Sequence, residues 1–257
     1  MGINDVIELT GKTALITGGS RGIGRASCRL LAAAGCNVVV GYQNNHEAAH
    51  GLVDELTQAG RRAIAVTGDV RIRGDVEKLF VRSREVFGSV DIVVGNAGIW
   101  KRAPIDEMSE SDWEETMDVN LKSIYHTCHF AALEMKPRKS GKIILVGSTA
   151  GQRGEPFHSH YAATKGAIIS LAKSLASELG PSGIRVNVVA PGWVDTDMSA
   201  DVLAEPESKK LIEDRIPLGY IPDAAEIAGP ILFLASDLSN HVHGEVINVN
   251  GGSVLCG

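Results

Sequence analysis

Short, almost uninterrupted apolar runs alternate with longer amphipathic segments along most of the chain. The apolar runs have strand length, and they cover Thr13–Thr17, Cys36–Val40, Ala63–Val66, Asp91–Val94, Lys142–Val146, Arg185–Val189 and Glu245–Val249. The segments between them have helical character, and they cover Arg25–Ala34, Glu47–Ala59, Asp75–Phe87, Asp112–Met135, Tyr161–Leu179 and Ala224–Ala235. Apolar strands separated by helices are typical of a parallel sheet covered on both faces. The pattern therefore predicts an α/β protein with a single doubly wound parallel sheet, the Rossmann fold.

Length and composition indicate that this sheet belongs to a single domain. With 257 residues and 44% apolar content, the chain can bury a sizeable core, and an α/β fold of this size needs no second domain. The net charge of −6 argues against nucleic-acid binding, which normally requires a basic patch. The amino terminus has neither a basic leader nor an apolar run long enough to cross a membrane. We expect a cytoplasmic protein without a membrane partner.

The four cysteines change this picture little. Cys28, Cys36, Cys128 and Cys256 contain no Cys-x-x-Cys pair. We therefore expect reduced, mostly buried thiols rather than disulfides or a zinc site. The closely spaced pairs His158-x-His160 and His241-x-His243 have no third ligand beside them, so we predict no metal site.

Glycines follow the first predicted strand and open the first helix. Gly18-x-x-x-Gly22-x-Gly24 lets the backbone approach a pyrophosphate, and the helix amino terminus offers unpaired N–H groups to it. The spacing differs from Gly-x-Gly-x-x-Gly, so the general dinucleotide fingerprint is not matched literally. Ligands of doubly wound sheets bind beyond the carboxyl ends of the strands, where Asp69, Asn96 and Ser148 also stand.

A phenol and an ammonium group occur four residues apart. If a helix begins just before Tyr161, its side chain and that of Lys165 lie on one face, one turn apart. The positive charge should lower the pKa of the phenol toward working pH, where proton transfer is most useful. Ser148 ends the preceding apolar strand and could polarise the same carbonyl. Tyr-x-x-x-Lys alone is weak evidence, so its surroundings decide its value.

These surroundings resemble the short-chain dehydrogenase/reductase family over essentially the whole chain. The motifs stand in family order, and they are Thr17–Gly24, Gly95–Gly98, Asn120, Ser148, Tyr161-x-x-x-Lys165 and Pro191-Gly192. The resemblance implies an enzyme that acts on CH–OH groups with NAD(P) as acceptor. It also implies a catalytic tetrad of Asn120, Ser148, Tyr161 and Lys165. Tyr161 would be the general acid/base, Lys165 would lower its pKa and hold the nicotinamide ribose, Ser148 would orient the substrate oxygen, and Asn120 would support a water chain to Lys165.

The resemblance further implies a set of cofactor contacts. Besides Tyr161 and Lys165, these are Gly18, Ser20, Arg21, Gly22, Ile23, Gly24, Tyr42, Asp69, Val70, Asn96, Ala97, Gly98, Pro191, Gly192, Val194 and Thr196. NAD enzymes usually place an acidic residue after the second strand, whereas residues 41–45 contain none. Arg21 could pair with a 2′-phosphate instead. We predict a preference for NADP(H), with NAD(H) possible.

Further expectations concern the substrate. Trp100, Gln152, Arg153, Phe157, His158, His160 and Trp193 are candidates for the substrate mouth. Residues 1–140 would form the cofactor half, and the polar segment 192–217, interrupted by Pro206, would form a lid. The helices Asp112–Met135 and Tyr161–Leu179 resemble the faces through which family members form tetramers, so we expect a homotetramer.

Within the family, the motif sequences of this chain most resemble those of 3-oxoacyl-(acyl-carrier-protein) reductase-like members. His126 and Ser177 stand where those reductases tend to carry arginine, which weakens the docking of an acidic carrier protein. We therefore predict hydride transfer between nicotinamide and a ketone or secondary alcohol. The alternatives are that carrier-protein reductase itself, a sugar or alcohol dehydrogenase using NAD, and a non-catalytic protein that senses dinucleotides.

Overall fold

Seven parallel strands form one sheet in the computed structural model, which describes residues 7–255. The strands are β1 (Thr13–Thr17), β2 (Asn37–Tyr42), β3 (Ala63–Thr67), β4 (Ile92–Gly95), β5 (Gly141–Val146), β6 (Ile184–Pro191) and β7 (Val246–Val249). Their order is β3-β2-β1-β4-β5-β6-β7, and every neighbouring pair is parallel. The strand order reverses between β1 and β4, which is where doubly wound sheets bind ligands. The predicted fold class is confirmed.

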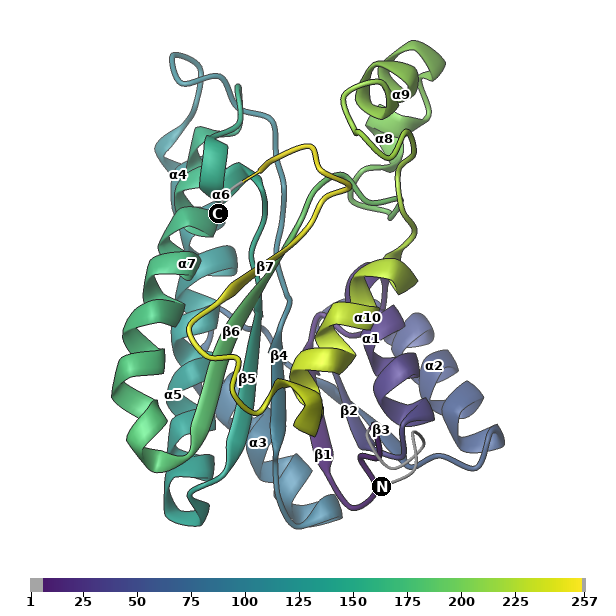
Figure 1. The fold of residues 1–257 in the computed structure, drawn as a ribbon, viewed down its shortest axis with the longest axis vertical. Coiled ribbons are helices and arrows are strands. Elements are labelled where there is room, and N and C mark those ends of the chain that lie inside the picture. Colours follow the sequence, from purple (N-terminus) through teal and green to yellow (C-terminus); the bar gives the residue numbers. More distant parts are fainter. Residues whose placement is uncertain (1–6, 256–257) are drawn as a thin grey trace.

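Helices cover both faces of this sheet (Figure 1). They are α1 (Gly22–Ala33), α2 (His46–Gln58), α3 (Arg73–Phe87), α4 (Glu110–Met117), α5 (Ser123–Met135), α6 (Ala150–Arg153), α7 (Ser159–Leu179), α8 (Ala200–Leu203), α9 (Pro206–Glu213) and α10 (Ala224–Ala235). Side chains alternate along each strand, so Ile16 packs with Leu31 and Ile231 of α1 and α10. The preceding position, Leu15, faces the opposite way and packs in a second apolar cluster with Phe80 of α3.

One predicted helix is interrupted. Asp112–Met135 was expected to be continuous, but a π-helical turn at Asp118–Lys122 separates α4 from α5. Asn120 lies in the middle of this turn and is fully buried. Single π turns inside helices are frequent at functional sites, and propensity gives no signal for them.

The thiols within residues 7–255 behave as expected. Cys28, Cys36 and Cys128 are free and buried. Burial raises the pKa of the Cys36 and Cys128 thiols to about 12, which makes them poor nucleophiles. Cys256 lies outside the described residues. Each helix of the described part is too short or too polar to traverse a lipid bilayer.

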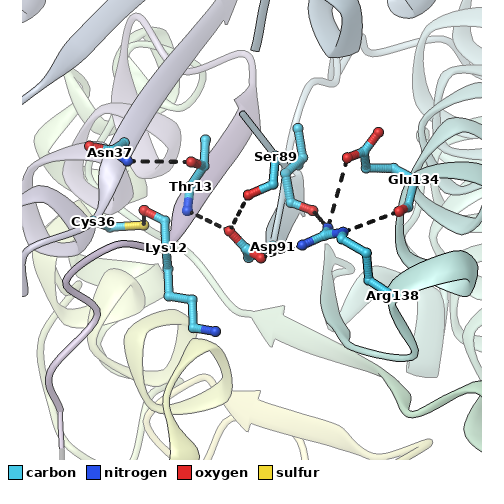
Figure 2. Close-up of polar contacts among 9 residues, drawn as sticks. Lys12, Thr13, Cys36, Asn37, Ser89, Asp91, Glu134 and Arg138 are labelled. Atoms are coloured by element: carbon cyan, nitrogen blue, oxygen red, sulfur yellow. Dashed lines mark hydrogen bonds and ion pairs between the residues drawn. The ribbon is translucent and has the colours of Figure 1, made fainter. Parts of the chain in front are cut away.

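A polar network joins the amino ends of the central strands (Figure 2). Asp91 accepts hydrogen bonds from the Thr13 backbone N–H at 2.9 Å, from Ser89 Oγ at 3.0 Å and from Arg138 at 2.6 Å. Burial raises the pKa of the Asp91 carboxyl, but these hydrogen bonds outweigh burial and hold the pKa below its ordinary value. The charged carboxylate therefore stabilises the folded state.

Replacing Asp91 with asparagine should lower the free energy of unfolding by about 1.5–3 kcal/mol at neutral pH, because charge-assisted hydrogen bonds are lost. A carboxyl whose folded-state pKa is depressed contributes stability above its unfolded value, near 3.9, and loses that contribution as pH falls through the folded-state pKa. Urea unfolding from pH 7 to 3 should thus show the difference between wild type and variant shrinking below about pH 4. The exposed Asp54→Asn variant is the control, and an equal loss there would contradict the assignment.

Candidate active site

A cleft of about 810 Å³, including its open mouth, lies at the carboxyl ends of the strands. Its walls come from the segments that follow β1, β4, β5 and β6 and from α7. The lining residues are Ile23, Asn96, Gly98, Trp100, Val146, Gly147, Ser148, Thr149, Arg153, Glu155, Tyr161, Lys165, Pro191, Gly192, Trp193, Val194, Thr196, Met198 and Ser199. Three of the four tetrad residues predicted from the sequence therefore reach one cavity.

Tyr161 and Lys165 lie one turn apart on α7 and face β5. Lys165 donates a hydrogen bond from Nζ to the Val146 carbonyl oxygen at 2.8 Å. The same Nζ lies 5.6 Å from the centroid of the Tyr161 ring. Ser148 lies two residues after the end of β5, and its Oγ accepts a hydrogen bond from the Ala150 N–H at 3.1 Å. The three side chains are each at most 9% exposed, so substrate atoms that meet them there leave bulk water.

The protonation states differ from the expectation drawn from charge alone. Burial raises the pKa of Tyr161 to about 12, although a hydrogen bond with Ser148 lowers it. Burial also lowers the pKa of Lys165 to about 8. The expected fall of the phenol pKa toward neutrality was thus wrong for the free protein. Desolvation penalises both charged forms, and the ammonium group is directed at a carbonyl oxygen.

Close backbone packing fixes α7 beside the cleft. A Cβ atom on Gly151 of α6 would stand 2.4 Å from the Lys165 carbonyl carbon and 2.6 Å from the Gly166 nitrogen. No flexible side chain can move away to relieve these contacts, because both partners are backbone atoms. Gly151 therefore lets α6 lie directly on the turn of α7 that carries Lys165.

The Gly151→Ala variant should accordingly lose activity and about 1–3 kcal/mol of stability, the usual range for overpacking. Gly51 of α2 offers a matched control, since a Cβ there meets nothing within 4 Å. Gly51→Ala should instead stabilise by roughly 0.5–1 kcal/mol, because alanine is the better helix former. Thermal unfolding and turnover of both variants check the pair. A neutral Gly151→Ala result would show that α6 can shift without disturbing Lys165.

Asn120 does not line the cleft, although it stands behind it. Its Oδ1 accepts a hydrogen bond from the Ile99 N–H at 2.8 Å, and its Nδ2 donates to the Ile99 carbonyl oxygen at 2.9 Å. A longer contact of 3.4 Å joins Nδ2 to Thr164 Oγ1 of α7. The π turn gives Asn120 this position, so its side chain ties the segment after β4 to α7.

The glycine turn after β1 is held against β4. Asn96 donates from Nδ2 to the carbonyl oxygens of Thr17 at 3.0 Å and Gly18 at 3.1 Å. Gly18 has a φ of +63°, and a Cβ on Gly24 would stand 2.2 Å from the Gly18 carbonyl oxygen. Glycine is therefore required at both positions for the turn to close this tightly.

Helix α1 presents an uncapped amino terminus to the cleft. No side chain caps it and no acidic residue lies in its first turn, so its N–H groups and partial positive charge are available to an anion. Ile23 of this turn lines the cleft. The Arg21 side chain is 64% exposed and lies 4.0 Å from Asp197, which is 68% exposed. An ion pair this long and exposed is weak, and Arg21 can turn to another anion.

The end of β2 carries no free carboxylate within the described residues. Tyr42 is buried and lies 3.4 Å, Oη to Nε2, from His50. Gln43 donates to Asp69 at 2.9 Å, and Asp69 is also held by Arg71 at 2.6 Å. Hydrogen bonds from Arg71 keep the pKa of Asp69 below its ordinary value. Asp69 is thus occupied by neighbouring side chains.

Other predicted cofactor residues also lie outside the cleft lining. These are Gly18, Ser20, Arg21, Gly22, Gly24, Tyr42, Asp69, Val70 and Ala97. The Val70 carbonyl oxygen lies 3.2 Å from His126 Nδ1, and the Ala97 N–H donates to Thr17 Oγ1 at 3.2 Å.

Only some of the residues expected at the substrate mouth line the cleft. Trp100, Arg153 and Trp193 line it. Gln152, Phe157, His158 and His160 do not: Gln152 turns toward β7, donating to Asn248 at 2.6 Å. His158 stands behind Trp100, with ring centroids 4.3 Å apart and an interplanar angle of 3°. His160 is fully buried, and both of its ring nitrogens lack a hydrogen-bond partner within residues 7–255.

Residues 192–217 contain two short helices, α8 and α9, which stand apart from the sheet at the upper right of Figure 1. Pro206 does not interrupt this segment as the sequence suggested. It occupies the first turn of α9, where its missing N–H costs nothing. Met198 and Ser199 of this segment line the cleft. Glu155 also lines it and was missed, because nothing in its local sequence distinguishes it from a surface carboxylate.

Among residues 7–255, no group of three His, Cys, Asp or Glu side chains is arranged to hold a metal ion.

Known proteins are similar to this chain over nearly its full length. Residues 18–253 match the family model described as enoyl-(acyl carrier protein) reductase. The 3-oxoacyl-[acyl-carrier-protein] reductase of Staphylococcus aureus is 39% identical over 244 residues, covering 95% of this chain and 98% of the relative. The L-rhamnose 1-dehydrogenase (NAD(P)(+)) of Azotobacter vinelandii is 40% identical over 248 residues, covering 95% and 97%.

A solved structure agrees with these relatives. It is a gluconate 5-dehydrogenase from Burkholderia cenocepacia in complex with NADP and tartrate, with a TM-score of 0.93 and 34% identity over 98% of both chains. Relatives of such similarity over nearly the full length share more than a fold. The chain therefore belongs to the short-chain dehydrogenase/reductase family, and it is an oxidoreductase of alcohol and carbonyl groups.

Proposed function

We propose that this enzyme transfers a hydride between NADP(H) and a ketone or secondary-alcohol substrate, with Tyr161 as general acid/base. The observation that carries the proposal is that Ser148, Tyr161 and Lys165 open into one cleft with the first turn of α1. A carbonyl oxygen placed between two hydroxyl groups is polarised by both, and it can be protonated by the more acidic one.

The residues present fit a dinucleotide. The uncapped α1 terminus suits a pyrophosphate, and the glycines at 18 and 24 let the turn before it close tightly. When bound, the nicotinamide supplies or accepts the hydride. The exposed Arg21 and the lack of a free carboxylate after β2 favour a 2′-phosphate. The bound NADP in the Burkholderia cenocepacia structure supports the same preference.

Each tetrad side chain then has a defined task. With a pKa of about 12, Tyr161 is a protonated phenol at neutral pH and can donate its proton to a developing alkoxide. Ser148 donates a hydrogen bond to the same oxygen. Lys165 keeps an ammonium group next to the phenol until pH rises through about 8, the value to which burial lowers its pKa. Asn120 contacts the segment after β4 through Ile99 and α7 through Thr164, and so positions the two relative to each other.

Assembly and closure belong to the same proposal. Tyr125 and Leu133 of α5 are 51% and 60% exposed, and they border a hollow that Leu171 and Leu175 of α7 also line. Apolar helix faces of this kind favour association with further copies, so we propose a homotetramer through α5 and α7.

We also propose that residues 192–217 act as a lid, that residues 1–140 bind the cofactor, and that the enzyme works in the cytoplasm.

A spectrophotometric scan of ketones with NADPH and of alcohols with NADP⁺ tests the function. Turnover of at least one substrate class, with a lower Michaelis constant for NADP(H) than for NAD(H), is the expected result. Binding of dinucleotide without turnover of any carbonyl compound or alcohol would favour a dinucleotide-sensing role instead. Activity confined to 3-oxoacyl thioesters would assign the enzyme to the carrier-protein reductases.

A further inference from the structure

Two indole rings form a corner in the wall of the cleft. The Trp100 and Trp193 ring centroids lie 5.5 Å apart at an interplanar angle of 84°, and both residues line the cavity that holds Tyr161. Indole faces carry partial negative charge, so they attract the partly positive C–H groups of a hydroxylated carbon chain. A substrate lying in this corner would be contacted on two sides.

The corner is fixed before any substrate arrives. His158 stacks on the rear face of Trp100, and its Nδ1 lies 2.9 Å from the Pro156 carbonyl oxygen. The Ala103 N–H donates to the Phe157 carbonyl oxygen at 2.8 Å, which joins the segment that carries Trp100 to the one that carries His158. Trp100 therefore cannot swing away easily, and a preorganised wall loses little entropy on binding.

Charge in the same wall indicates what the corner receives. Arg153 lines the cleft, and its guanidinium group has no ion pair or hydrogen bond among the described residues. Lys165, the other cation of the lining, is directed at Val146. Glu155 is the acidic side chain of the lining, and a carboxylate readily accepts hydrogen bonds from neighbouring hydroxyl groups. An unpaired arginine suits a carboxylate bidentately.

These features do not suit a long acyl chain. Such a chain would pass two charged side chains, Arg153 and Glu155, without pairing either of them. The chain also carries a net charge of −6, which disfavours an acidic carrier protein. A compact molecule that carries one carboxylate and several hydroxyl groups suits Arg153, Glu155 and the two indole rings together.

We propose that the substrate is a short-chain polyhydroxy carboxylic acid, or the corresponding keto acid. Its carboxylate pairs with Arg153, its carbon chain lies against Trp100 and Trp193, and its hydroxyl groups reach Glu155. This inference rests on the proposed function, since it names the substrate of the same cleft. Oxidation removes a hydride from the alcohol carbon to NADP⁺ and the hydroxyl proton to solvent through Tyr161, which leaves a keto acid and NADPH.

Matched pairs of probes test the carboxylate contact. D-gluconate, D-galactonate and D-xylonate are each compared with their neutral alditols, D-sorbitol, galactitol and xylitol, by kcat/KM with NADP⁺. The best acid should exceed its alditol by at least about tenfold, and Arg153→Gln should lower that ratio by about 10–100-fold, the usual effect of a lost charged hydrogen bond. Arg61→Gln, an exposed arginine outside the cleft lining, should leave the ratio unchanged.

Tryptophan fluorescence gives a second readout that needs no turnover. The sequence has three tryptophans, and two of them form the corner, while Trp113 is 41% exposed on α4. In a Tyr161→Phe, Trp113→Phe variant, the best acid should change the emission saturably, whereas its alditol should not at the same concentration. Adding Arg153→Gln should weaken the fitted affinity for the acid by about 10–100-fold.

The outcomes separate the two proposals. Efficient turnover of neutral alcohols, simple ketones or acyl thioesters, with a ratio that Arg153→Gln does not alter, would overturn the substrate assignment and leave the oxidoreductase function standing. Folded protein that turns over no alcohol or ketone with either cofactor would overturn the proposed function, and this inference with it.

Discussion

Replacing Tyr161 with phenylalanine is expected to reduce kcat by about 10²–10⁴-fold, equivalent to about 3–5 kcal/mol of transition-state stabilisation. The phenol is the proton donor in the cleft, and it is held beside Ser148 and Lys165 with 9% of its surface exposed. Phenylalanine keeps the ring and its packing but removes the proton. Stopped assays of NADPH oxidation with the best ketone from the scan measure the loss.

The same variant should still bind the cofactor, because the α1 turn and the residues after β2 are untouched. Titration of NADPH fluorescence should therefore give a dissociation constant within about threefold of wild type, a difference below 1 kcal/mol. Tyr220→Phe is a matched control, since that phenol is 44% exposed and bonds to Glu226 away from the cleft. Unchanged turnover in Tyr161→Phe would exclude Tyr161 as the acid.

Removing the Arg21 side chain as Arg21→Ala should raise the Michaelis constant for NADPH by about 10–100-fold, since a charge-assisted pair with phosphate is lost. The Michaelis constant for NADH should change little, because that cofactor carries no 2′-phosphate. Gln43→Asp should act in the same direction, as it adds a carboxylate after β2. Initial rates with each cofactor at saturating substrate measure both variants.

Arg29 offers the control for this experiment. It lies on α1, the helix that the glycine turn opens. Unlike Arg21, it is paired with Glu55 at 2.7 Å and lies outside the cleft lining. Arg29→Ala should leave both Michaelis constants unchanged. Equal losses for NADPH and NADH in Arg21→Ala would assign Arg21 to the shared part of the cofactor and remove the argument for phosphate selectivity.

Much of the architecture was predictable from local pattern. Continuous apolar runs indicated buried parallel strands, and all seven occur, each boundary lying within two residues of the predicted one. The helix bearing Tyr161 begins at Ser159, so its four-residue spacing from Lys165 did place both side chains on one face. Such features depend on near neighbours in sequence, which is why a single chain reveals them.

Features that depend on distant neighbours could not be predicted in this way. The π turn exists where Asn120 reaches Ile99, and the two residues are brought together only by the sheet. The pKa of Tyr161 follows the burial of its ring, which the sequence does not state. His158 and His160 lie within three residues of Tyr161 in the sequence. His158 nevertheless stacks on Trp100, and His160 is fully buried.

The π turn also constrains how the chain can change in length. A π turn holds one residue more than an α-helical turn, so α5 is rotated by about 100° relative to a continuation of α4. Deleting any single residue from Asp118–Lys122 would restore regular winding and swing Ile124 and Met135 of α5, both buried, away from the sheet. The length of this turn thus sets the rotational phase of the helix that follows it, up to the start of β5.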